Sequence, residues 1–236
     1  NRWSTDNLGD EYGTRYGVRG LAYLAPQIWL SGSLWQLDMD DLDDHWGGDV
    51  ALRLPNPLLN GYVSLVAARE EIETVEALRE EIDAIRAGLR TYTRLFDLFD
   101  LFADLSQIDR SDGNDTTMLD GRLLYRLNEW PYVGFGWRFR FADSDRDPPE
   151  YWAPEQLQQH QAHINIRGAW GRLSGSLSAE AGVAEQKDSD WSFVWGTRGV
   201  GDLLLTRRFS LSAELGYFES TDYERLFGRL GLTARF

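Results

Sequence analysis

The chain of 236 residues contains no cysteine and a single lysine, Lys187. The absence of cysteine excludes disulfide bonds and thiolate metal sites, but it does not identify the compartment in which the chain folds. Arginine is therefore almost the sole basic residue, and the formal net charge is −14. Because binding to phosphate backbones requires clustered basic side chains, this balance argues against nucleic acid as a partner.

Long apolar runs are missing as well. The mean hydropathy is −0.44, and no run reaches the roughly eighteen apolar residues that indicate a transmembrane helix. A transmembrane β-barrel needs no such run, because its strands alternate lipid-facing apolar residues with polar residues that face the lumen. The ten tryptophans, ten tyrosines and eleven phenylalanines are many for this length, and barrels use such residues at the membrane interfaces.

The end of the chain shows this alternation most clearly. Leu226, Leu230 and Leu232 fall on one face of an extended segment, and Arg229 and Thr233 fall on the other. The same period of two recurs upstream and predicts about thirteen strands, most of them near the ~9–11 residues that cross a membrane obliquely. The predicted spans are 14–25, 28–38, 45–55, 59–70, 82–95, 100–109, 116–128, 131–142, 160–170, 172–184, 191–205, 208–218 and 225–236.

Short and long connections alternate between these spans. The short ones lie at 26–27, 56–57, 97–99, 129–131, 171 and 207, and the long polar ones at 38–44, 70–81, 109–115, 143–158, 185–190 and 219–224. Short periplasmic turns and long extracellular loops give a barrel this alternation. We therefore predict an all-β, transmembrane, antiparallel up-and-down β-barrel domain over residues 1–236, in the bacterial outer membrane.

Two segments need a separate interpretation. Residues 73–89 have the pattern of an amphipathic helix, and we expect a short helix or turn followed by a strand from about Ile82. Bacterial single-chain barrels usually have an even number of strands, so about thirteen strands indicate that others precede Asn1. The chain is then the C-terminal part of a larger barrel, and residues 1–12 are the tail of an external loop or part of another strand.

The polar faces of the predicted strands carry most of the arginines. Charges on these faces must point into a lumen, because an arginine that faces lipid costs about 2–4 kcal/mol at the midplane. In a structural role, these charged residues would form ladders of ion pairs that brace the barrel wall, which is the commoner role for any single residue. In a functional role, they would line a conduit for a polar solute. The predicted lumen-lining residues are Arg19, Asp49, Arg53, Arg86, Arg90, Asp104, Asp120, Arg122, Arg126, Arg138, Arg140, His163, Arg167, Arg172, Glu180, Arg198, Asp202, Arg208, Glu214 and Arg229.

Aromatic residues cluster near the ends of the predicted strands, which favours two interfacial girdles over an ordinary soluble core. The girdle at the short turns would comprise Trp29, Phe96, Trp130, Tyr132, Trp170, Phe209 and Phe236. The girdle near the long loops would comprise Trp35, Trp46, Trp137, Trp191, Phe193 and Trp195.

Acidic residues concentrate in the long loops and predict a negatively charged extracellular mouth. Such a mouth would attract cations or a cationic polymer and repel anions. The alternative is a set of solvated loops that bind divalent cations between lipopolysaccharide molecules. The predicted mouth residues are Asp38, Asp40, Asp41, Asp43, Asp44, Asp109, Asp112, Asp115, Asp143 and Asp145.

Evidence for catalysis is weak. The three histidines are His45, His160 and His163, and only His163 falls on a polar face near serine and acidic residues. No nucleophile motif accompanies it, and a lone histidine in a lumen is usually a hydrogen-bonding wall residue. No metal-ligand spacing is present, and DRSDGND at 109–115 lacks the length and terminal glutamate of a calcium loop. We expect neither an enzyme nor a cofactor or metal.

Several short motifs resemble one family when taken in order. These are ETVEALR at 73–79, SDGND at 111–115, YWAP at 151–154 before a long amphipathic strand, and the final Arg235-Phe236. The order resembles the C-terminal porin domain of exopolysaccharide export proteins. The resemblance implies a sixteen-stranded barrel that follows a periplasmic tetratricopeptide-repeat region and works with other subunits of a secretion system.

The same resemblance implies a substrate class. Members of the family export poly-N-acetylglucosamine, Pel polysaccharide or cellulose in biofilm formation, and an acidic mouth suits a partly deacetylated, cationic polymer. We therefore expect an outer-membrane conduit for an exopolysaccharide chain, with Pel slightly favoured, in contact with membrane lipid and lipopolysaccharide. The alternatives are a general diffusion or uptake porin and, less favoured, a barrel enzyme or a structural anchor.

Overall fold

The structure is a computed structural model that describes the backbone of residues 2–5, 9–39, 42–56, 60–71, 75–148, 151, 153–219 and 224–234. Side chains are described for residues 17–38, 45–56, 60–69, 77–148, 151, 153–219, 224 and 226–233. Within this part of the chain there are fourteen strands and one short helix.

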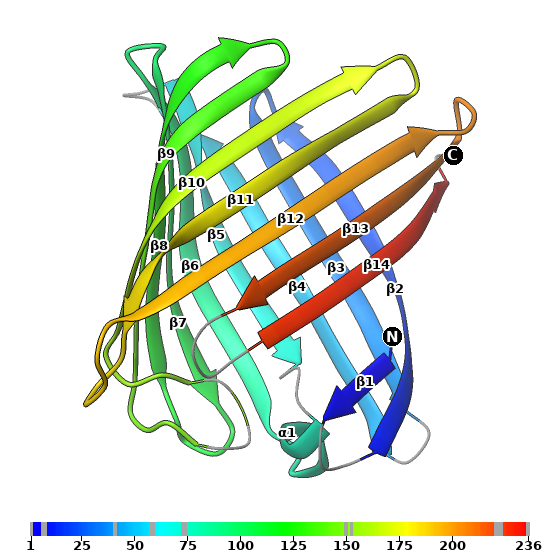
Figure 1. Ribbon diagram of the computed structural model, residues 1–236. Coiled ribbons are helices and arrows are strands. Elements are labelled where there is room, and N and C mark those ends of the chain that lie inside the picture. The colour runs from blue at the N-terminus through cyan, green and yellow to red at the C-terminus, as the bar shows by residue number, and fades with distance from the viewer. Residues whose placement is uncertain are drawn as a thin grey trace. The chain divides into compact units, whose positions relative to one another are not determined.

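The strands follow one another along the chain with short turns and longer loops between them (Figure 1). Their bounds are β1 Arg2–Thr5, β2 Gly9–Ala25, β3 Ile28–Met39, β4 Leu42–Pro55, β5 Asn60–Glu71, β6 Asp83–Leu95, β7 Phe99–Arg110, β8 Thr116–Glu129, β9 Tyr132–Ser144, β10 Leu157–Trp170, β11 Leu173–Glu185, β12 Ser192–Leu204, β13 Phe209–Glu219 and β14 Glu224–Ala234.

The order of strands in the sheet is the order of the chain, from β1 to β14. Each of the thirteen strands predicted from the period of two is present, as β2–β14, with ends that shift by a few residues. The additional strand is the short β1, which pairs with the beginning of β2. One of the two interpretations of residues 1–12, part of another strand, is therefore confirmed.

The first compact unit comprises residues 1–93, 102–120 and 141–157. In it, β1–β5 pair antiparallel, each with the next. The registers place Arg19 opposite Ser33, and Ser33 opposite Asp49, so these three polar residues share one face of β2, β3 and β4. Because the side-chain period of a strand is two, this register also fixes the face of every other residue in these strands.

Helix α1, Val75–Arg79, lies in the loop between β5 and β6 of the first unit (Figure 1). Its buried Leu78 packs with Leu37 and Trp35, and Ala77 packs with Ile82. The expectation of a short helix followed by a strand from about Ile82 is confirmed, since β6 begins at Asp83. No helix in the described residues is long and apolar enough to cross a membrane.

The second compact unit comprises residues 94–101, 121–140 and 158–236. Strands β10–β14 pair antiparallel in it, each with the next. Gly171 and Arg172 make the turn from β10 to β11, where Gly171 has a φ of 61°. Such tight hairpin turns require left-handed backbone, which glycine adopts without a steric penalty.

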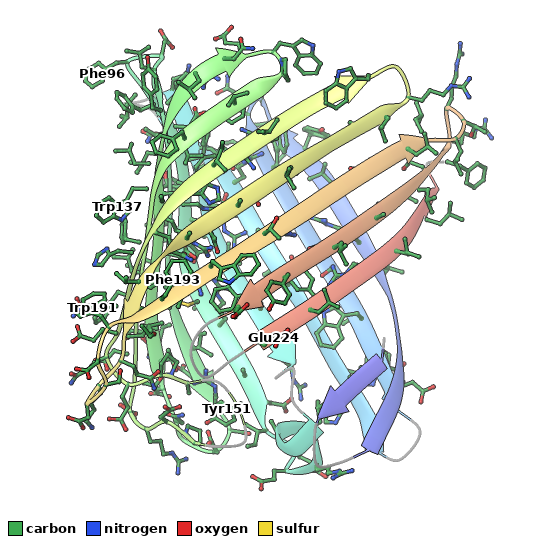
Figure 2. All side chains as sticks on the ribbon, viewed as in Figure 1. Phe96, Trp137, Tyr151, Trp191, Phe193 and Glu224 are labelled. Atoms are coloured by element: carbon green, nitrogen blue, oxygen red, sulfur yellow. The ribbon has the colours of Figure 1, made fainter. Side chains whose placement is uncertain are left out.

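Burial in both units is the reverse of that in a water-soluble protein. Leu230 is 79% exposed, whereas the carboxylate-bearing Asp100 is 1% exposed. In the second unit, Trp137, Trp191 and Phe193 project from the apolar face (Figure 2). Large apolar residues are exposed along nearly every strand rather than packed against a second sheet, which contradicts a soluble β-sandwich and is the pattern of a lipid-facing surface.

Candidate functional site

The candidate site in each unit is the polar face of its strands, and in the first unit it includes the acidic loops where β3, β5, β7 and β9 end. Strand β9 illustrates the division of faces. Phe135, Trp137 and Phe141 are exposed on one face, and Arg138 and Arg140 alternate with them on the other. The apolar face suits lipid, so the polar face is the surface that a transported solute would meet.

In the first unit, one carboxylate of β7 holds two arginines of β6. Arg86 Nη2 lies 2.9 Å from Asp104 Oδ1, and Arg90 Nη2 lies 2.8 Å from Asp104 Oδ2. On the same unit, the hydroxyl of Ser33 hydrogen-bonds to the carboxylate of Asp49. These contacts bring together predicted lumen-lining residues as cross-strand pairs, which is the bracing arrangement expected of a wetted barrel wall.

In the second unit, the carboxylate of Asp100 is enclosed by donors near the short turns. Arg126 Nη2 donates to Asp100 Oδ1 at 2.6 Å, and the hydroxyl of Tyr132 donates to Oδ2 at 2.8 Å. Arg94 Nε lies 3.8 Å from Oδ1, and the guanidinium of Arg167 lies 4.1 Å from the ring centre of Tyr132. The predicted residues Arg126 and Arg167 thus meet at a cluster whose centre, Asp100, was not among the predicted site residues.

A second carboxylate cluster of this unit contains His163. Arg138 Nη1 donates to both carboxylate oxygens of Glu180, at 2.7 and 2.6 Å, and His163 Nδ1 lies 3.3 Å from Glu180 Oε2. A histidine beside a carboxylate is one part of a catalytic triad, but here the carboxylate is shared with an arginine. Among the described residues, no group of three or more histidine, aspartate or glutamate side chains could hold a metal ion.

The remaining pairs on the polar face of the second unit are open to solvent. Arg198 Nη2 lies 2.7 Å from Glu214 Oε1, and its side chain is 57% exposed. Arg229 of β14 lies opposite Glu214 of β13, and Asp202 of β12 lies opposite Ser212 of β13. Exposed pairs of this kind are weak, so they leave charges that a passing solute can engage.

The other predicted lumen-lining residues keep the expected parity. Arg53 lies on the polar face of β4, since it shares that face with Asp49. Asp120 and Arg122 alternate on β8 with the exposed Leu123, and Arg140 alternates on β9 with the exposed Phe141.

Arg172 and Arg208 are not on strand faces, and the strand positions predicted for them are wrong. Arg172 lies in the turn before β11, where its Nη1 reaches the carbonyl of Leu205. Arg208 lies in the turn before β13, where its backbone N–H donates to the hydroxyl of Thr206. Alternation with a period of two continues through these residues, so the pattern assigns them to a strand although they form part of a tight turn.

Three predicted girdle residues lie on the polar face instead. Trp29 lies opposite Arg53 in the register of β3 and β4, Trp35 packs against buried Leu37 and Leu78, and Tyr132 binds Asp100. Their positions follow from strand parity, which proximity to a strand end does not reveal. The exposed aromatic residues that match the girdle prediction are Phe96, Trp130, Trp170 and Phe209 at the short turns, and Trp46, Trp137, Trp191 and Phe193 near the long loops.

Part of the predicted acidic mouth can be placed. Asp109, Asp115 and Asp145 are exposed at the loop ends of the first unit, and Asp38 is exposed near the end of β3. Asp143 accepts a hydrogen bond from the backbone of Gln156 at 3.1 Å. Asp40 and Asp41 lie outside the described residues, as do the side chains of Asp43 and Asp44.

Asp112 belongs to a hydrogen-bonded node that ties together two long loops of the first unit. Its Oδ2 accepts from the hydroxyl of Tyr151 at 2.6 Å and from Arg146 at 3.1 Å. The buried amide of Asn114 donates to the Tyr151 hydroxyl at 2.9 Å and to the Arg146 carbonyl at 3.1 Å. Gly113 lies between Asp112 and Asn114, and its φ of 77° is a left-handed conformation that glycine adopts without a steric penalty.

The hydroxyl of Tyr151, a residue labelled in Figure 2, is bonded to both Asp112 and Asn114 in this node. Burial raises the pKa of its hydroxyl, and the hydrogen bond to Asp112 raises the pKa further. The ring packs with Ala77, Ile82 and Ala153, so the SDGND and YWAP motifs and helix α1 form one ordered assembly. The turn residues of SDGND were the signal for this node, but nothing in the sequence identified Tyr151 as its partner.

The alternating faces, the up-and-down order and the exposed apolar band together define the fold of a bacterial outer-membrane β-barrel. The chain is similar in structure to a bacterial polysaccharide outer membrane secretin, with a TM-score of 0.73 and 12% identity over 96% of this chain and 81% of that one. No protein-family model matches the sequence, and no characterised protein sequence matches it significantly.

Two further solved structures resemble the chain more weakly. One is the KdgM porin in complex with disordered oligogalacturonate, with a TM-score of 0.46 and 9% identity over 81% of this chain and 92% of that one. The other is a loop-deletion mutant of OmpT, an outer membrane protein of Vibrio cholerae, with a TM-score of 0.45 and 13% identity over 99% and 94%.

Proposed function

We propose that this chain forms the wall of an outer-membrane conduit through which a secreted exopolysaccharide leaves the bacterial cell during biofilm formation. The observation that carries the proposal is the polar face of each unit, on which charges are held as separate cross-strand pairs rather than gathered into one deep site. A polymer must slide, and conduction requires contacts weak enough to release each unit that they bind. The structural similarity to a polysaccharide secretin supports the choice of solute.

The sign of the loop charges suggests the kind of polymer. Asp109, Asp115 and Asp145 are exposed at one end of the strands of the first unit, and the chain has a net charge of −14. Such a surface attracts cations over about a Debye length, ~8 Å at physiological ionic strength. A partly deacetylated amino-sugar polymer, of the Pel or poly-N-acetylglucosamine type, is cationic and fits it better than neutral cellulose. A periplasmic tetratricopeptide-repeat region would deliver the polymer.

The test is secretion of polymer by cells that depend on this protein. The variant Asp115→Asn/Asp145→Asn removes two exposed loop charges without a described side-chain partner. We expect it to assemble normally and to lower secretion of cationic polymer by about two-fold or more at low ionic strength, with the difference lost at high salt. The control Asp97→Asn/Glu129→Gln removes the same charge at the short-turn end and should secrete as the wild type does.

The outcomes separate the proposal from its main alternative. Equal secretion by both variants would show that the exposed loop charges do not help export. The proposal of an export conduit would be unaffected by that result. If cells that lack the protein secrete polymer normally but lose permeability to small solutes, the protein is a diffusion porin and the export proposal is wrong.

A further inference from the structure

We propose that the polar face of the first unit carries a binding site for the pyranose rings of a polysaccharide. The site is a row of five aromatic side chains and one arginine, one residue from each of six consecutive strands, near the ends that meet the short turns. This inference rests on the proposed function for the identity of its ligand. The row consists of Tyr23, Trp29, Arg53, Tyr62, Tyr92 and Phe102, from β2 to β7.

The first half of the row is centred on an arginine between two rings. The ring centres of Tyr23 and Trp29 lie 5.2 Å apart in an edge-to-face arrangement. The guanidinium carbon of Arg53 lies 5.0 Å from the ring centre of Trp29 and 3.3 Å from that of Tyr62. Stacking of this kind holds a guanidinium flat and leaves the N–H groups at its edge free to donate.

The second half of the row consists of rings alone. The ring centres of Tyr62 and Tyr92 lie 5.6 Å apart, and those of Tyr92 and Phe102 lie 4.9 Å apart. These steps are close to the separation of neighbouring strands, about 4.8 Å, so each strand supplies one ring. The row therefore runs across the strands and not along them.

The register places the row on the wetted face. Tyr23 lies opposite Trp29, and Trp29 lies opposite Arg53. Trp29 shares its face of β3 with Ser33, which is bonded to Asp49. An aromatic residue that serves only as a membrane anchor belongs on the lipid-facing side, so anchoring does not explain these rings.

The row is also accessible to solvent, and its arginine has hydrogen-bond donors that a ligand could use. Tyr23 is 69% exposed, and Trp29, Tyr62, Tyr92 and Phe102 are partly exposed. No carboxylate among the described residues pairs with Arg53, although Asp49 lies on the same strand face. Two other polar-face arginines of the first unit, Arg86 and Arg90, are paired with the carboxylate of Asp104. Arg53 is instead held between aromatic rings, with donors to spare for a ligand.

A pyranose ring is the ligand whose chemistry matches this surface. One side of the sugar presents C–H groups, which the negative face of an aromatic ring attracts, and its edge presents hydroxyl oxygens that a guanidinium can bind. Stacking tolerates variation in ring substituents, as it does for bases on aromatic platforms. A chain that moves along the strands would cross the row and touch few rings at once, so each contact would be brief.

The test is equilibrium binding of soluble oligosaccharides to the full chain folded in detergent micelles. The probes are oligomers of N-acetylglucosamine, their deacetylated forms and cello-oligosaccharides, and the readout is a dissociation constant from saturation-transfer NMR. We expect wild-type protein to bind, and the variant Trp29→Leu/Tyr62→Leu/Tyr92→Leu to bind about ten-fold more weakly. The variant Tyr62→Phe/Tyr92→Phe keeps the rings and should retain most of the affinity.

The control removes a ring pair from the opposite face of the strands. Phe99 and Tyr125, in the second unit, have ring centres 5.5 Å apart, and Phe99→Leu/Tyr125→Leu should bind as the wild type does. Heat modifiability on gels and circular dichroism confirm that each variant is folded. The inference is overturned if wild-type protein binds no oligosaccharide, or if the leucine triple variant binds as well as the control. Secretion is measured separately, so binding without secretion would overturn only the proposed function.

Discussion

Replacing Asp100 by leucine tests the arrangement on which the polar face of the second unit depends. The side chain of Asp100 is 1% exposed, and that of its partner Arg126 is 6% exposed. Leucine has the same branched arrangement of heavy atoms as aspartate, although it is larger, and it accepts no hydrogen bond. The substitution would therefore leave the guanidinium of Arg126 buried beside the hydroxyl of Tyr132. Arg94, whose Nε lies 3.8 Å from the carboxylate that is removed, would add like charge.

The expected loss is about 3–5 kcal/mol in the free energy of unfolding, which is the usual cost of removing one partner of a buried ion pair. The individual contacts give a similar figure. Asp100 accepts from Arg126 at 2.6 Å and from Tyr132 at 2.8 Å, and hydrogen bonds to charged groups contribute about 1.5–3 kcal/mol each. The exposed Glu129, 3.4 Å from Arg126, compensates little.

The assay is urea unfolding of the protein in lipid vesicles, followed by the fluorescence of its ten tryptophans. The matched control is Glu214→Leu, which removes a carboxylate from the pair with Arg198 on the same face. Because the Arg198 side chain is 57% exposed and can be solvated by water, this substitution should cost at most about 1 kcal/mol. The double variant Asp100→Leu/Arg126→Leu should recover most of the loss, because neither charge then remains buried. Equal losses for Asp100→Leu and Glu214→Leu would refute the argument from burial.

Two further predictions test the lipid-facing side and the loop node. Leu230 is 79% exposed on the apolar face, and the substitution Leu230→Arg should lower the free energy of unfolding by about 2–4 kcal/mol. The substitution Ser212→Arg on the polar face should change that free energy by less than about 1 kcal/mol. Equal changes would mean that the faces are assigned wrongly. The pKa of Tyr151 is raised above 10.0, so the stabilisation from its protonated hydroxyl is present below pH 10 and is lost as the pH rises through the raised pKa. A tyrosinate absorbance titration of Tyr151→Phe should show one late-ionising tyrosine fewer than that of the wild type. Loss of an early-ionising tyrosine instead would contradict the node.

The strands could be predicted from the sequence because the signal for each is local. A strand that separates lipid from water must alternate apolar and polar side chains, whatever its neighbours are. The sequence alone therefore predicts that Arg138 and Arg140 lie on one face of β9, opposite the face of Phe135, Trp137 and Phe141.

The boundaries between turns and strands are harder to predict from the sequence than the interiors of the strands. Arg172 and Arg208 continue the polar alternation of the strands that follow them, yet both lie in turns. Their backbone conformation is set by closure of the hairpin, which depends on how the two strands pair.

Local alternation separates the two faces of each strand, because the strand's own backbone imposes the period of two. Contacts between strands and loops could be seen only in the folded chain. Asp100 with Arg126, Asn114 with Tyr151, and Arg53 between Trp29 and Tyr62 all join different strands or loops. Such contacts depend on the register between strands, and register is set by interactions between segments that are distant in the chain.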